Sequence, residues 1–185
     1  MKKPPVNDNL VLENSFISAT RQICVVTPDF ERTLQSYANS LGIGPWWVNE
    51  YIPPDLHSTT FRGEEVEHGM RIALAWTGEM NWEIIQPLFG PNIYTEFLEK
   101  TGGRGGVHHI GFLLEDFDTD WSESVQTFVK NGQTVIQEGG WHGVHWAYFE
   151  SDDPAQPQYE LISREPGWIR PEPLSWFPHP PSIMT

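Results

Sequence analysis

An internal repeat constrains the fold of this chain more than any other feature of its sequence. Residues 21–31 and 108–118 share one pattern, in which a short apolar run ends in Asp-Phe and an acidic residue. We expect Asp29 and Asp116 to cap helices over roughly 30–41 and 117–131, because a short carboxylate accepts the free amide hydrogens of a first helical turn. Gly42 and Gly132 stand where these helices should end, as the left-handed C-terminal position favours.

Strand-like runs follow each predicted helix. They are 46–51, 59–61, 70–76 and 82–86 in the first half, and 134–138, 144–150 and 158–163 in the second. Each half therefore reads as a βαβββ module, which cannot bury its sheet alone. We predict an α+β fold in which two tandem βαβββ modules form one curved mixed sheet around a cleft.

Changes in composition along the chain suggest the domain boundaries. We expect an N-terminal arm (1–17), a first module (18–100), a second module (101–165) that begins at a glycine-rich linker, and a Pro-rich C-terminal tail (166–185). Proline is excluded from helix interiors and from the middle of a sheet. The tail should therefore wrap over the surface or reach a partner subunit.

The charge balance limits the partners. The net charge of −14, from 25 acidic and 11 basic residues, argues against nucleic acid and against an anionic membrane. Cys24, the single cysteine, lies in an apolar run and reads as a buried core thiol. The sequence shows no secretory signal pattern and no run near the ~20 apolar residues that a membrane span needs. We therefore expect a cytoplasmic protein.

Four polar residues occupy matching places in the repeat. Gln22 and His109 each lie seven residues before the capping Asp of their half, while Glu83 and Glu160 each follow an aromatic residue in the last strand of their half. Each alone reads more simply as a structural polar or salt-bridged residue. A buried carboxylate, however, needs a charged partner or a metal. Because all four residues lie at repeat-equivalent positions, we predict that they bind a divalent metal in the cleft. Zn²⁺ is the first candidate, and Fe²⁺, Mn²⁺, Co²⁺ and Ni²⁺ are the alternatives.

The order and spacing of several motifs resemble the vicinal oxygen chelate superfamily, which includes glyoxalases, bleomycin resistance proteins and dioxygenases. The matching stretches are Gln22–Phe30, 41–46, Glu83–Pro87, 106–112 and Tyr159–Ile162. The nearest members are glyoxalase I and methylmalonyl-CoA epimerase. The resemblance implies that Gln22, Glu83, His109 and Glu160 are the metal ligands, the set of zinc-type glyoxalase I. Methylmalonyl-CoA epimerase usually has His and Gln at the first two places, and extradiol dioxygenases need a second His, so this sequence departs from both.

The resemblance also implies a reaction. We expect a metal-dependent lyase or isomerase that transfers a proton next to the metal-bound carbonyl or enediolate of a small, hydrophobic substrate. Glu160 would abstract the proton and Glu83 would return it. One alternative is a lactoylglutathione lyase or acyl-CoA epimerase, and a second is a non-catalytic, resistance-type binding protein. We expect a homodimer.

The aromatic content suggests an apolar pocket for this substrate. The residues expected to bind substrate are Trp46, Trp47, Trp76, His142, His145 and Trp146. The anionic groups of glutathione or CoA would need cations, for which Arg62, Arg71 and Arg104 are the candidates. His108, next to His109 in a strand, should point to the opposite face of the sheet and be structural.

Overall fold

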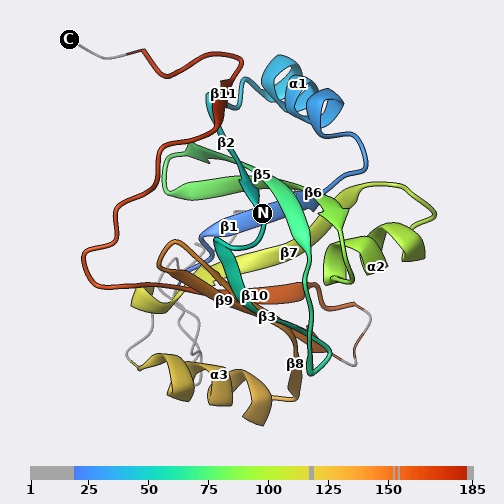
Figure 1. Ribbon diagram of the computed structural model, residues 1–185, viewed down its shortest axis with the longest axis vertical. Coiled ribbons are helices and arrows are strands. Elements are labelled where there is room, and N and C mark those ends of the chain that lie inside the picture. The colour runs from blue at the N-terminus through green and yellow to red at the C-terminus, as the bar shows by residue number, and fades with distance from the viewer. Residues whose placement is uncertain (1–18, 117–118, 152, 154, 183–185) are drawn as a thin grey trace, which may run out of the picture.

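The computed structural model describes residues 19–116, 119–151, 153 and 155–182 (Figure 1). The expected N-terminal arm (1–17) lies outside this range. The elements are β1 (Gln22–Val26), α1 (Phe30–Leu41), β2 (Trp46–Tyr51), β3 (Leu56–Phe61), β4 (Glu64–Glu65), β5 (Gly69–Thr77), β6 (Met80–Phe89), α2 (Ile93–Lys100), β7 (Gly106–Leu113), a 3₁₀ turn (Leu114–Asp116), α3 (Trp121–Lys130), β8 (Gln133–Trp141), β9 (Val144–Ser151), β10 (Gln158–Arg164) and β11 (Ser175–Phe177). In the described part of the chain, no helix is long and apolar enough to cross a membrane.

The described strands form one curved, mixed sheet, as the α+β prediction required (Figure 1). Its order is β11-β2-β5-β6-β1-β7-β10-β9-β8-β3-β4. The halves meet at its middle, where β1 pairs antiparallel with β7, while β6 and β10 flank this pair in parallel pairings. The first strand of each half therefore lies beside the last strand of the same half and beside the first strand of the other.

Successive side chains of a strand point to opposite faces of the sheet, so the apolar side chains form one layer on each face. On one face, α1 packs Phe30 and Leu34 against Trp46 and Ile84, and α3 covers the matching face of the second half. On the other face, inward side chains of both halves form one cluster, to which α2 contributes Ile93 and Tyr94. The inner residues of this shared cluster surround the cleft predicted between the halves.

The helix ends predicted from the sequence are both confirmed in the first half only. Asp29 accepts a hydrogen bond from the Arg32 amide at 3.2 Å, and Gly42 has φ 66°, so both predicted ends of α1 are confirmed. The predicted start of the second helix after Asp116 is wrong for the described residues, because that segment ends in the 3₁₀ turn. Asp120 caps α3 instead and accepts from the Glu123 amide at 2.8 Å. Residues 117 and 118 lie outside the described residues.

Two segments add strands to distant parts of the sheet. The run around 59–61 was predicted as a strand of the first module, but β3 pairs with β8 of the second half, with Leu56 opposite Trp141. The tail adds β11 to the edge strand β2, with Trp176 opposite Trp47. Stacking of Tyr51 on Trp141, with ring centroids 4.0 Å apart, joins the two arms of the curved sheet at the β2–β3 connection.

Candidate metal centre

The four predicted ligands come from four adjacent strands at the middle of the sheet: Glu83 on β6, Gln22 on β1, His109 on β7 and Glu160 on β10. They lie in two neighbouring rows, where a row is a set of residues that are register partners on adjacent strands. Cys24 is the register partner of both Glu83 and His109, and Gly111 is the register partner of both Gln22 and Glu160. Period-two alternation then turns all four side chains toward the same face.

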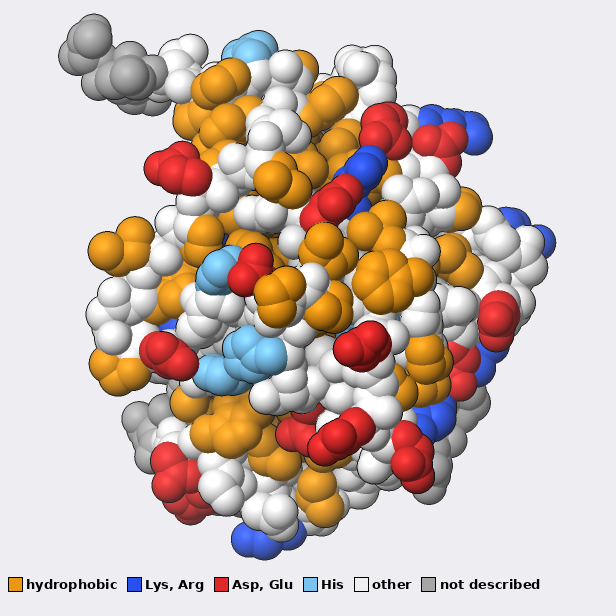
Figure 2. Space-filling view, viewed as in Figure 1, with side chains coloured by type: hydrophobic (Ala, Val, Ile, Leu, Met, Phe, Trp, Pro, Cys, Tyr) orange, Lys and Arg blue, Asp and Glu red, His pale blue; other side chains and the backbone are white. Residues whose placement is uncertain are grey.

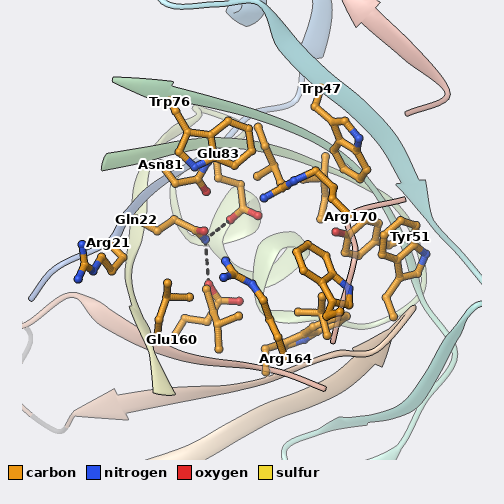
Figure 3. A pocket seen from close by; sticks show the side chains of 18 of the residues that line it. Arg21, Gln22, Trp47, Tyr51, Trp76, Asn81, Glu83, Glu160, Arg164 and Arg170 are labelled. Atoms are coloured by element: carbon orange, nitrogen blue, oxygen red, sulfur yellow. Dashed lines mark hydrogen bonds between the residues drawn. The ribbon is translucent and has the colours of Figure 1, made fainter. Parts of the chain in front are cut away.

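The four side chains are buried and in mutual contact. The Gln22 amide nitrogen donates to Oε2 of Glu83 and to Oε2 of Glu160, each at 2.9 Å (Figure 3). Nε2 of His109 lies 3.3 Å from Oε2 of Glu83 and 3.2 Å from Oε2 of Glu160. The structure therefore brings together the four residues that the repeat singled out.

The donor set fits a divalent metal. His109 Nε2 is buried without a well-directed hydrogen bond, although two carboxylates face it, which is the arrangement expected where a metal would lie between these atoms. A half-turn of the Gln22 amide would present its oxygen in place of its nitrogen. Cys24 is buried as expected, but its sulfur also faces the site, since the ligand atoms of Cys24, Glu83 and His109 all lie within 4.8 Å of one another.

The charges of the cluster depend on one another. Burial by itself would lower the pKa of His109, but the negative charges of Glu160 and Glu83 raise the pKa to about 9. Burial raises the pKa of Glu83, and burial together with Glu83 raises that of the Cys24 thiol. Without metal, His109 therefore keeps a proton at neutral pH, and a metal ion has to displace that proton to bind.

His108 belongs to this centre, contrary to the prediction that it faces away. A β-bulge in β7 pairs Cys24 with His109 and Val25 with Val107, which leaves His108 as the extra residue. The bulge breaks the alternation, so Nδ1 of His108 lies 2.9 Å from Nδ1 of His109. Burial lowers the pKa of His108 and keeps its ring neutral. His108 can therefore fix the ring orientation of His109 through the nitrogen that faces away from the carboxylates.

A cavity of about 110 Å³ opens over the cluster, and Gln22, Glu83 and Glu160 line it. Its walls include the aromatic side chains of Trp47, Tyr51, Trp76, Trp141, Trp146 and Trp168. Three of the predicted substrate-binding residues, Trp47, Trp76 and Trp146, thus line the cavity. Trp46 does not: it lies in the core under α1, where its indole nitrogen donates to the Ile43 carbonyl at 2.8 Å.

His142 and His145 also lie outside this cavity. Nε2 of His142 is 3.5 Å from a carboxylate oxygen of Asp55, and Nε2 of His145 is 3.4 Å from one of Glu165. Both side chains are more than two-fifths exposed. Their place is on the outer side of the β8–β9 turn.

The arginines at the cavity are not those that the sequence suggested. Arg62 is paired with Glu96 and Glu150 at the surface, and Arg71 with Glu31 and Glu50. Arg104 is exposed. The cations that line the cavity are Arg21, Arg164 and Arg170. Sequence reasoning missed the last two because they lie at the end of β10 and in the Pro-rich tail, where no repeat or periodicity marks them.

Comparison with known proteins identifies the family. Residues 21–148 match the Glyoxalase/Bleomycin resistance protein/Dioxygenase superfamily, and the chain belongs to it. Among solved structures, the chain is similar to a hypothetical protein from Bacillus halodurans C-125, with 21% identity over 80% of this chain and 94% of that chain and a TM-score of 0.59. It is also similar to methylmalonyl-CoA epimerase from Mycobacterium tuberculosis, with 17% identity over 85% and 95% and a TM-score of 0.59.

A third similar structure is a variant of methylmalonyl-CoA epimerase from Streptomyces coelicolor in complex with 2-nitronate-propionyl-CoA, with 19% identity over 80% of this chain and 95% of that chain and a TM-score of 0.55. The comparison with curated proteins gives no match. At these identities the likeness shows a shared fold. The family match over residues 21–148 confirms the superfamily that the sequence motifs suggested.

Proposed function

We propose that this chain is a metal-dependent lyase or isomerase that moves a proton on the carbon next to the carbonyl of a small substrate. One observation carries the proposal: an imidazole, two carboxylates and an amide converge at the buried end of an aromatic cavity. The proposed metal is Zn²⁺, with Fe²⁺, Mn²⁺, Co²⁺ or Ni²⁺ as alternatives that suit the same donors.

The proposed chemistry needs two carboxylates with separate tasks. A divalent ion held by Gln22, Glu83, His109 and Glu160 would polarise a carbonyl and make the hydrogen on the neighbouring carbon more acidic. Glu160 on β10 and Glu83 on β6 come from the two halves of the chain, with Gln22 hydrogen-bonded between them. In our proposal Glu160 takes the proton and Glu83 returns one, which allows isomerisation, and elimination needs the first step alone.

Metal binding is the first test. The purified protein should hold about one divalent ion per chain, and zinc at 100 times its Kd should raise the free energy of unfolding by about 2.7 kcal/mol. A His109→Gln variant should lose most of that gain, whereas His179→Gln, which changes an exposed histidine of the tail, should keep it. No bound metal and no stabilisation by any of the five ions would favour a non-catalytic binding protein.

Proton transfer is the second test. Small aryl ketones incubated with the zinc-loaded protein in D₂O should gain deuterium next to the carbonyl, followed by NMR. Glu160→Gln should abolish this exchange, while Glu99→Gln, an exposed carboxylate on α2, should not change it. Exchange at the wild-type rate in Glu160→Gln would remove Glu160 from the role of base.

The proposal also includes the assembly and location of the protein. We infer a cytoplasmic homodimer that acts on a small molecule. Large apolar side chains remain exposed on the described part of the single chain, among them Phe89, Val107 and Leu174, and a second copy could cover some of them. Light scattering at micromolar concentration should give twice the mass of 21.2 kDa. A monomer under these conditions would contradict the dimer.

A further inference from the structure

The C-terminal tail forms part of the cavity wall through Trp168, Arg170 and Pro171. At one end the Glu165 amide donates to the Gly143 carbonyl and the Trp168 indole to the His142 carbonyl, both at 2.9 Å. At the other end the Trp47 indole donates to the Pro171 carbonyl at 3.0 Å, and β11 then pairs with β2. Figure 1 shows this stretch passing from the second half across to the first. The tail is therefore fixed on both arms of the sheet, with residues 169 and 170 between its two attachments.

Arg170 lies at the middle of this span and lines the cavity. The centre of its guanidinium is 4.3 Å from the ring centroid of Trp76, 5.4 Å from that of Trp168 and 5.7 Å from that of Trp47. Three indole rings thus fix a planar cation before any ligand arrives. Burial lowers the pKa of Arg170, yet an arginine stays charged at neutral pH.

Arg170 has no carboxylate partner among the residues that the structure describes, unlike the surface arginines Arg62 and Arg71. Arg164 brings a second guanidinium to the same cavity; it stacks on Trp168 at 5.1 Å and lies 3.3 Å from a carboxylate oxygen of Glu115. In Figure 3 both side chains reach into the space that holds Glu83 and Glu160.

The positive charge of Arg170 and Arg164 in the cavity contrasts with the negative net charge of the chain. Acidic side chains are spread over the face shown in Figure 2, and the net charge of the chain is −14. A half-buried cation without an anionic partner raises the free energy of the folded chain unless a ligand supplies that anion. The guanidinium fork matches the two oxygens of a carboxylate, and it forms stronger hydrogen bonds to them than to a neutral amide.

We propose that the cavity takes a small organic carboxylate with an aromatic or apolar body, and that Arg170 binds its carboxylate. This inference rests on the proposed function, because it names the substrate class of the same site. The cavity volume of about 110 Å³ is below the ~150 Å³ of an apolar cavity that holds benzene, so it limits the body of the ligand to about one small ring. The family match covers residues 21–148, and Arg170 lies outside it.

The test compares benzoate with benzamide, which have nearly the same shape but differ in charge. Isothermal titration of the zinc-loaded protein should show at least tenfold tighter binding of benzoate. Arg170→Gln should raise the Kd of benzoate at least tenfold and leave the Kd of benzamide within twofold, and Arg170→Lys should fall between Arg170→Gln and wild type, because the charge remains without the fork. Arg32→Gln removes the same charge from the exposed face of α1 and should change neither Kd.

The outcomes separate a ligand-binding role from a structural one. If Arg170 only holds the tail in place by stacking, both Kd values change together in Arg170→Gln, and the proposal is overturned. It is equally overturned if the wild-type protein does not prefer the carboxylate, including the case in which neither compound binds. Metal content is measured on the same samples: a wild-type protein that holds none of the five proposed metals but keeps the Arg170-dependent preference contradicts the proposed function and supports this inference.

Discussion

Gly111 separates Gln22 from Glu160 in the candidate metal centre, and a single methyl group at this position should displace a proposed ligand. A Cβ built on Gly111 would lie 2.8 Å from Cβ of Gln22 and 3.4 Å from its Cγ and Cδ. Ordinary contacts begin near 3.4 Å, so Cβ of Gln22 would have to move by about 0.6 Å. Because this atom is attached directly to the backbone of β1, strand and ligand must shift together.

Gly111→Ala should weaken both metal binding and folding. Overpacking a core costs about 1–3 kcal/mol, and the lower entropy of the unfolded chain returns about 0.4–1 kcal/mol, so the metal-free protein should lose up to about 2.6 kcal/mol. Zinc affinity should fall about 10–100-fold, the range seen when groups that orient ligands are changed. Competition with a chromophoric chelator gives the affinity, and urea unfolding in EDTA gives the stability.

Gly106→Ala on the same strand is the matched control. The added Cβ would meet only Cζ of Phe97, at an ordinary distance of 3.6 Å. Its zinc affinity should equal that of the wild type. If Gly111→Ala also binds zinc with wild-type affinity, then Gln22 is not a ligand or the site does not depend on its position, and the reasoning is refuted.

Three further predictions concern stability. Phe128 is buried and stacks on Phe149 with ring centroids 4.3 Å apart, so Phe128→Ala should reduce the free energy of urea unfolding by about 3–5 kcal/mol, and a loss below 1 kcal/mol would contradict its place in the core. Asp29→Ala should remove the cap of α1 and lower the same quantity by about 1 kcal/mol, whereas Asp29→Asn should retain most of it. The pKa of His109 in the folded protein lies above its usual 6.5, so the stability that protonated His109 contributes to the metal-free protein is complete below about pH 6.5 and is lost as the pH rises toward 9. Urea midpoints measured in EDTA should therefore fall over this pH range. Midpoints that stay level in the wild type, or that fall equally in His109→Gln, would exclude His109 as the cause.

Much of the fold and of the candidate site follows from local chemistry. The strand period turns Gln22, Cys24 and Val26 to one face, and Asp29 ends the loop that follows. The repeat implies that the first strands of the halves are equivalent, and in the structure these two strands, β1 and β7, pair side by side. The four ligand candidates could be named from this pattern, and the structure places them together; their metal-binding role stays a prediction.

The rest depends on contacts between residues far apart in the sequence. The pairing of β3 with β8 places Leu56 opposite Trp141, and nothing local in residues 56–61 signals that contact. One extra residue in β7 reverses the alternation and brings His108 against His109, although the sequence there reads as a regular strand. Arg170 sits in a proline-rich stretch that reads as irregular, and its meaning appears only when the tail meets Trp47 and Trp76.

The two rows at the middle of the sheet have a consequence for how the protein holds together. Each half supplies two of the four ligands, and each row is completed only by a residue of the other half. A bound ion would therefore act as a crosslink across the β1–β7 seam, and its affinity would report whether the two halves are docked. If the chain were cut in the glycine-rich linker at 102–106, the two fragments should reassociate more tightly with zinc than without it, because neither fragment can bind the ion fully alone.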